Sequence, residues 1–205
     1  MVDQLLIAGV SFGRNCIGIV LHPYEAYRRI VREGSLYELI YITSLLIFYF
    51  ALASVVKVAA FRPFLLTRQF IVLVSAVVAT YCVVICLLWL VGQKMGGKGT
   101  LRGVAIAWGY TLVPTVLWFF VTSLLYVVLP PPRTTSLAGI ALSALFLAFS
   151  ATLFLWKLML GYLALRFGLK LDLARILVVV AVVGPVVGIY SYGMYQLGIF
   201  KVPFV

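Results

Sequence analysis

Long apolar runs separated by short polar connections fill most of this chain and restrict what it can fold into. Five such runs cover residues 36–56, 69–91, 104–129, 137–157 and 176–200. A helix that crosses the hydrocarbon core of a bilayer needs about 20 mostly apolar residues, and each run reaches that length. The chain is 65% hydrophobic and 10% charged, whereas soluble domains are about 25% charged. The sequence therefore predicts an all-α polytopic membrane bundle with five transmembrane helices.

The residues between the runs favour helix termination. Lys57 ends the first run, glycines and lysines fill residues 92–99 after the second, and prolines 130–132 follow the third. Proline has a fixed φ and no backbone N–H, so a helix does not continue through three of them. We expect short loops at these places and one transmembrane domain over residues 36–205.

The positive charges indicate how the bundle is oriented. Short cytoplasmic loops of membrane proteins are enriched in Lys and Arg. With a cytoplasmic N-terminus, ten of these residues lie on the cytoplasmic side and five on the other. The larger group contains Arg14, Arg28, Arg29, Arg32, Lys94, Lys98, Arg102, Arg166, Lys170 and Arg175, and the smaller group contains Lys57, Arg62, Arg68, Arg133 and Lys201. We therefore expect the N-terminus in the cytoplasm and the C-terminus outside.

Residues 1–35 are expected to form a separate cytoplasmic or interfacial segment. Residues 1–21 are moderately apolar but are interrupted by Arg14 and Asn15, and polar groups at the centre of a span are costly. A sixth span or a re-entrant segment is the alternative. Pro23 suits the first position of a following amphipathic helix. This helix would place aromatic side chains in the membrane and arginines against anionic lipid, which makes a candidate lipid or partner surface of Tyr24, Tyr27, Arg28, Arg29 and Arg32.

Few residues of the spans could perform chemistry. After Glu38 the chain has a single acidic residue, Asp172, and no histidine. Acid–base catalysis, proton relays and metal centres need carboxylates or imidazoles. Cys82 and Cys86 have no such partner nearby in the sequence and are interpreted as packing residues. We expect no catalytic residues, no cofactor and no bound metal, and the scattered basic residues do not form a stripe typical of nucleic-acid binding.

Two of the expected spans contain proline. Pro114 lies ten residues into the third span, where it cannot bond to the carbonyl of Tyr110, so a kink is expected. Gly184 and Pro185 are expected to break the fifth span in the same way, and Gly184 and Gly188 form a face on which a helix of this chain or of a second copy could pack closely. Such breaks either shape a compact bundle or mark a transport pathway. The shape interpretation is favoured, because the sequence suggests no buried charge beside either break.

Three motifs occur in a fixed order along the chain. Residues 21–30 read LHPYEAYRRI and fit the pattern "P-x-E-x-[FY]-R-x-I", and residues 96–102 read GGKGTLR, a glycine-rich loop with Gly97 and Gly99. Gly109, Tyr110 and Pro114 fit the pattern "G-Y-x-x-x-P". This order resembles the Ypt-interacting protein (Yip) family of five-span membrane proteins over residues 21–200. The acidic "D-L-Y-G-P" element of eukaryotic members has no match here, so the chain is similar to the short prokaryotic form.

The resemblance implies a multi-pass protein without enzymatic activity. We expect a membrane-organising or partner-binding adaptor that acts through its basic cytoplasmic face in a prokaryotic cell membrane. Its partners would be anionic lipid headgroups at the N-terminal segment, a membrane or cytoplasmic protein, and a second copy of the chain. The alternative is a small transporter or channel subunit whose pathway lies at Pro114 and at Gly184 and Pro185.

Overall fold

The structure is a computed structural model that describes residues 2–57, 63–128 and 137–198. The described part contains eight α-helices and no strand, which confirms the all-α class. The helices are α1 (Val2–Leu21), α2 (Pro23–Glu33), α3 (Glu38–Lys57), α4 (Pro63–Lys94), α5 (Leu101–Tyr110), α6 (Val113–Val128), α7 (Leu137–Gly168) and α8 (Leu173–Gln196). The expected turn at residues 130–132 lies outside the described residues.

Five helical segments of the described part are long and apolar enough to cross a membrane. Four of them, Phe70–Lys94, Leu101–Leu125, Gly139–Gly168 and Leu173–Gln196, correspond to the last four spans predicted from the sequence. The fifth is Asp3–Leu21 in α1. The first predicted span, residues 36–56, is the continuous helix α3, which joins α2 at a bend of 117° and raises the number of candidates to six if the bent pair is one span.

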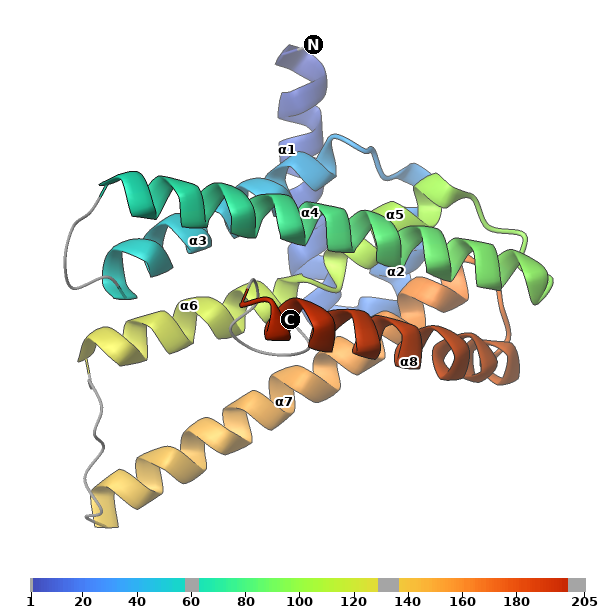
Figure 1. Cartoon of the computed structure of the whole chain (residues 1–205). Coiled ribbons are helices and arrows are strands. Elements are labelled where there is room, and N and C mark those ends of the chain that lie inside the picture. Colours follow the sequence, from blue (N-terminus) through green and yellow to red (C-terminus); the bar gives the residue numbers. More distant parts are fainter. Residues whose placement is uncertain (1, 58–62, 129–136, 199–205) are drawn as a thin grey trace.

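Helix α1 differs in direction from the rest of the bundle. Figure 1 shows α3, α4, α6 and α8 running in roughly one direction, while α1 crosses them steeply and α7 runs obliquely. A helix lying along the membrane surface would have such an orientation relative to spanning helices. The interfacial assignment of residues 1–35 remains a prediction, because α1 also has the length and composition of a span.

The third predicted span is divided where the sequence places its proline. Helix α5 ends at Tyr110 and α6 begins at Val113. At the junction the N–H of Thr111 donates to Trp108 O at 3.0 Å, and that of Leu112 donates to Gly109 O at 3.1 Å. These tighter i→i−3 bonds satisfy two N–H groups that come just before Pro114, which has no N–H of its own. The expected break is confirmed, although α5 and α6 together still form one candidate span.

The fifth predicted span is not divided. Helix α8 runs from Leu173 to Gln196 with Pro185 inside it, so Gly184 and Pro185 do not divide the helix, and the kink expected there stays a prediction. Proline at this position removes one hydrogen bond, to the carbonyl of Ala181, and membrane helices tolerate such a loss through small local adjustments. At Pro114 the neighbouring Tyr110 and Gly109 are also held by other helices, as described below.

Two clusters of buried side chains hold the helices together. The first joins α1, α2, α3, α5, α6 and α7, and the second joins α4, α5, α7 and α8 with the connection after α7. Helix α2 contributes Ala26, Tyr27 and Ile30 to the first cluster. Helices α5 and α7 take part in both clusters, and α5 also carries the motif residues Gly109 and Tyr110.

Candidate functional site: a basic end and a buried polar cluster

The connection between α4 and α5 lies against the connection between α7 and α8. The N–H of Lys98 donates to Leu169 O at 3.0 Å, which joins two segments far apart in the sequence. Within the first connection, Gly97 N donates to Gly92 O at 2.9 Å and Gln93 Nε2 donates to Gly99 O at 2.8 Å. Backbone bonds of this kind fix the two loops relative to each other.

The glycines of the family motif permit this close approach. A Cβ atom at Gly99 would lie 1.8 Å from Gly168 O and 2.6 Å from Leu169 Cα. A Cβ atom at Gly97 would lie 2.8 Å from Gly92 O. Both obstacles are backbone atoms, which cannot rotate away as a side-chain tip can. Gly97 and Gly99 therefore have a structural role, which is to let two backbones touch.

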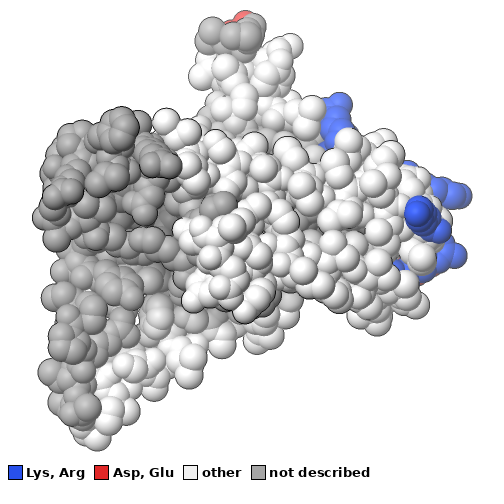
Figure 2. Space-filling view, viewed as in Figure 1, with Lys and Arg blue, Asp and Glu red and all other residues white. Residues whose placement is uncertain are grey.

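Basic side chains gather at the end of the molecule formed by these two loops. Figure 2 shows Lys and Arg concentrated at that end of the visible face. Arg175 lies beside Gly96, where a Cβ atom would be 3.0 Å from its Nη1. Arg102 Nη2 donates to Gly34 O at 2.9 Å and ties the α2–α3 junction to the same region. We define the basic end by its exposed cations, Lys94, Lys98, Arg102, Arg166, Lys170 and Arg175.

The two tyrosines of the candidate surface on α2 have different environments. Tyr24 is exposed and packs edge-on against Phe167, with ring centroids 4.9 Å apart. Tyr27 is fully buried within the first core cluster. The apolar face of α2 is thus covered by the protein's own helices, and Tyr27 does not form part of an exposed surface.

The three arginines of α2 also differ. Arg28 is exposed, and no hydrogen bond or ion pair of its side chain occurs among the described residues. Arg29 Nε donates to Asn15 Oδ1 at 3.1 Å. Arg32 pairs with Glu33 at 2.6 Å, and its hydrogen bonds and charge hold the pKa of that carboxyl below its ordinary value. Arg28 and Tyr24 are therefore the exposed members of the candidate surface whose side chains no polar contact in the described residues occupies, and its binding of lipid or a partner stays a prediction.

A buried polar cluster lies where α1, α3 and α5 meet. Asn15 and Glu38 are each 1% exposed, and Tyr110 is fully buried. Asn15 Nδ2 donates to Glu38 Oε2 at 3.0 Å and to the Tyr110 hydroxyl at 3.2 Å. The Tyr110 hydroxyl donates to the same carboxylate oxygen. Ser11 Oγ donates to Glu38 Oε1 at 3.1 Å. Because a buried carboxylate is costly unless it is hydrogen-bonded, these donors explain how Glu38 is tolerated there.

Glu38 also begins its own helix. Its Oε1 accepts from the N–H of Ser35 at 3.1 Å, while Ser35 Oγ accepts from the N–H of Tyr37 at 3.3 Å. The arrangement is a variant of the capping box in which Ser35 Oγ accepts from Tyr37 rather than from Glu38, and it satisfies N–H groups that the first helical turn leaves without partners. One carboxylate therefore starts α3 and joins it to α1 and α5.

The sequence analysis missed Asn15 and Glu38 as partners. From the sequence, Asn15 is a polar interruption of residues 1–21, and Glu38 is the residue after which the chain has a single acidic residue. The local signal that could have located Glu38 is the Ser35-x-x-Glu38 capping pattern. Nothing in the local sequence indicates that α1 would bury that carboxylate.

The "G-Y-x-x-x-P" motif contributes directly to this cluster. Tyr110 supplies its hydroxyl, and Pro114 is buried just beyond the helix break. A Cβ atom at Gly109 would lie 2.6 Å from Leu39 Cδ2 and 3.2 Å from the Tyr81 hydroxyl. Gly109 therefore lets α3 and α4 approach α5, and all three motif residues shape this junction.

The remaining predicted residues lie away from both sites, on α8. A Cβ atom at Gly184 would meet nothing within 4 Å, and Pro185 is exposed. Gly188 is half-buried. Among the residues that the structure describes, no three His, Cys, Asp or Glu side chains come together in a way that could hold a metal ion.

The length, composition and exposure of the helices define the class of protein to which this chain belongs. Long apolar helices with large exposed hydrophobic side chains and a charged end are those of a multi-pass integral membrane protein. A family model described as the Yip1 domain matches residues 17–194, which is most of the chain. The chain belongs to the Yip1 domain family, as the resemblance implied. Neither a curated protein nor a solved structure matches it.

Proposed function

We propose that this protein is a non-enzymatic membrane adaptor that binds its partners through the basic end. The observation that carries the proposal is the backbone contact between two sequence-distant loops, Lys98 N to Leu169 O. This contact fixes the two loops relative to each other, so that exposed cations of both loops lie on one preorganised surface. A preorganised charged surface favours association with an acidic partner by steering the encounter and by limiting the ordering cost of binding.

The charge distribution supports a cytoplasmic position for this surface. Ten Lys and Arg residues of the sequence fall on the side of the N-terminus, against five on the other, and such an excess marks the cytoplasmic side. Anionic headgroups of the inner leaflet would attract the same side, including Arg28 of α2. In this proposal the protein lies in a prokaryotic cell membrane and acts as an organiser of lipid or of a protein partner.

Charge reversal tests the adaptor function. Lys98, Lys170 and Arg175 would be changed together to Glu, and proteins crosslinked in cells would be compared with those of the wild type. The adaptor function predicts that a specific set of crosslinked partners is lost. Arg133→Glu, expected on the opposite side from the sequence, is the control and should keep the set. Identical partner sets for the triple variant and the wild type would contradict the proposal.

A transporter or channel subunit is the second candidate, and one observation favours it. The sequence alone disfavours transport, because it suggests no buried charge beside a helix break. The carboxylate of Glu38 is buried and bonded to Tyr110, the last residue of α5 at the Pro114 break. Buried ionisable groups beside broken helices are common at transport sites. Thermal stabilisation of the detergent-solubilised protein by an ion or metabolite, lost in Glu38→Gln, would support this candidate over the adaptor.

A further inference from the structure

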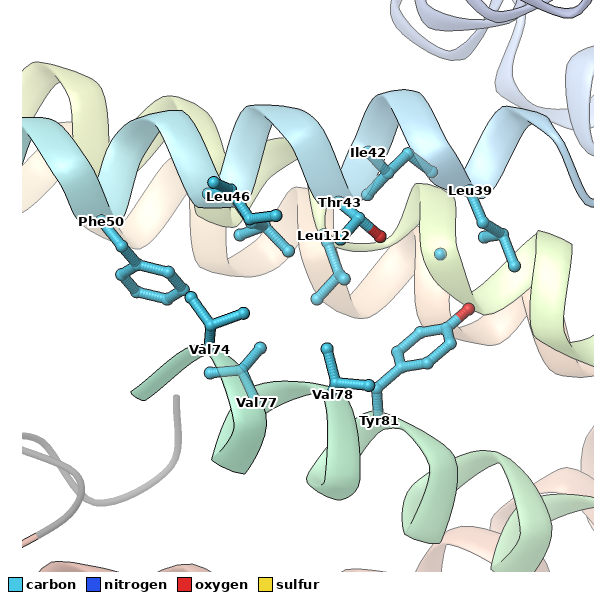
Figure 3. Close-up of a pocket in the computed structure, with 12 residues that line it drawn as sticks. Leu39, Ile42, Thr43, Leu46, Phe50, Val74, Val77, Val78, Tyr81 and Leu112 are labelled. Atoms are coloured by element: carbon cyan, nitrogen blue, oxygen red, sulfur yellow. The ribbon is translucent and has the colours of Figure 1, made fainter. Parts of the chain in front are cut away.

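An apolar cavity of about 120 Å³ lies between α3 and α4, with the α5–α6 junction forming part of its wall. Figure 3 shows side chains of α3 along one side and of α4 along the other, with Leu39 and Tyr81 at one end and Phe50 and Val74 at the other. The α3 residues that line it extend from Leu39 to Phe50, which is about 16 Å along a helix axis. The cavity is thus an elongated groove between two helices.

The lining of the groove suits a hydrocarbon chain. Leu, Ile, Val and Phe side chains make up most of it. The hydroxyl of Tyr81, which lies at one end, donates to Ala105 O and so is already bonded within the protein. Water would find few partners along such a wall. A transmembrane helix is about 10 Å across, too wide for a space of this volume, whereas a single acyl chain is narrow and is the main component of the surroundings of these helices.

A positively charged residue lies beyond the end of the groove marked by Leu39 and Tyr81. Arg102, Ala105 and Gly109 have i, i+3, i+7 spacing in α5 and share one face of the helix. Gly109 lines the groove, and Ala105 accepts the Tyr81 hydrogen bond. Arg102 therefore lies about 10 Å beyond Gly109 along the same face. Its Nη2 bonds to Gly34 O, and a guanidinium has further donors for a phosphate.

We propose that this groove binds an anionic phospholipid of the surrounding bilayer, with one acyl chain between α3 and α4 and the headgroup phosphate at Arg102. The apolar wall selects a chain and the adjacent cation selects an acidic headgroup. The acyl-chain part of the site lies between α3 and α4, and Arg102 is the one cation of the basic end that the site uses. It does not depend on the adaptor function, and either proposal can fail without the other.

Lipid binding in the groove is tested by substitutions that fill the groove with a large side chain. The purified protein in mild detergent would be offered phosphatidylglycerol or phosphatidylcholine with identical chains, and retained lipid would be counted by native mass spectrometry. Val78 of α4 lines the groove and is 45% exposed, whereas Val83 of the same helix is 41% exposed and does not line it. Val78→Trp should lose the phosphatidylglycerol that the wild type retains. Val83→Trp should keep it.

A second matched pair covers the case in which Val78→Trp does not fold. Ile47 lines the groove from α3, and Leu45 of the same helix is equally exposed but does not line it. Ile47→Trp should lose the lipid and Leu45→Trp should keep it. Equal retention within both pairs, or a wild type that retains neither phospholipid, would overturn the proposal.

The headgroup contact is tested separately. Arg102→Gln should reduce the preference for phosphatidylglycerol over phosphatidylcholine by about fivefold, the effect of one cation near an anionic lipid surface. Arg175→Gln removes a charge from the basic end but not from the groove, and it should leave the preference unchanged. An equal reduction in both variants would show that the preference reflects the overall charge of that end, and the assignment of the phosphate to Arg102 would be wrong.

Discussion

The side-chain amide of Asn15 donates a hydrogen bond of 3.0 Å to the carboxylate of Glu38, and both side chains are buried. This bond connects the N-terminal helix α1 to the start of α3, and the hydroxyl of Tyr110 adds α5 to the same carboxylate. Hydrogen bonds to a charged acceptor are stronger than neutral ones, and more so where water is excluded. The cluster therefore fixes α1 against the bundle independently of apolar packing.

Replacing Glu38 with Ala should destabilise the protein strongly. The change leaves buried donors of Asn15, Tyr110 and Ser11 without their acceptor and removes the capping bond to Ser35, at a cost of about 3 kcal/mol or more. Reversible unfolding in mixed detergent micelles would measure the difference. Glu33→Ala is the matched control, because Glu33 is exposed and, among the described residues, its carboxylate pairs with the neighbouring exposed Arg32, and it should change the unfolding free energy little. Similar losses in the two variants would show that the buried cluster has no special role.

Replacing Tyr110 with Phe should destabilise the protein less than Glu38→Ala does. The ring keeps its packing, and only the hydroxyl that donates to Glu38 and accepts from Asn15 is lost. We expect a loss of about 1–2 kcal/mol. Tyr24→Phe serves as the control, since Tyr24 is exposed. The double variant Tyr110→Phe with Asn15→Ala should lose less than the two single losses added together, because the residues share one network. Strict additivity would mean that they act separately.

The fold was predictable where local sequence determines it. The spans follow from apolar length, and the break between α5 and α6 follows from Pro114, which lacks the N–H that the helix needs. Pro185 has the same chemistry, yet α8 continues through it. The difference lies in tertiary contacts, since Gly109 and Tyr110 are fixed by α3 and α4 while a Cβ atom at Gly184 would touch nothing. A single sequence does not contain that information in local form.

The sequence indicated several residues of the candidate site, but not which other segments those residues contact. The sequence indicated the glycine-rich loop, but the reason for Gly99 is a backbone in another loop, at Gly168. Tyr27 follows the amphipathic pattern of α2, and that pattern alone cannot tell whether its apolar face meets lipid or protein. The structure buries Tyr27 in the core. Glu38 shows the same difficulty, because its burial depends on the packing of α1.

Replacing Gly99 with Ala should prevent the two loops of the basic end from meeting. The added Cβ atom would lie 1.8 Å from Gly168 O, so one backbone must move and the Lys98–Leu169 bond would be strained. We expect a marked fall in the yield of monodisperse protein and in its thermal stability. Gly193→Ala in α8 is the control, because its Cβ atom would meet nothing within 4 Å, and alanine is favoured over glycine in a helix by about 1 kcal/mol. A Gly99→Ala protein as stable as wild type would contradict the close approach.

The topology of α1 can be decided by locating the two ends of the chain. Five spans place the N-terminus in the cytoplasm and the C-terminus outside, whereas a crossing α1 adds a sixth span and places both ends on one side. Alkaline phosphatase fused after Val205 should be active, because that enzyme works only outside the cytoplasm. A protease site placed before Met1 should be cut only after the cells are opened.

A cysteine at position 98 gives an independent reference for the cytoplasmic side. In a chain whose native cysteines are replaced, Lys98→Cys should react with an impermeant maleimide only after permeabilisation, as expected for a cytoplasmic basic end. If the N-terminal site were cut in intact cells while this cysteine stayed protected, α1 would cross the membrane. The bond between Asn15 and Glu38 would then satisfy a polar group inside the bilayer.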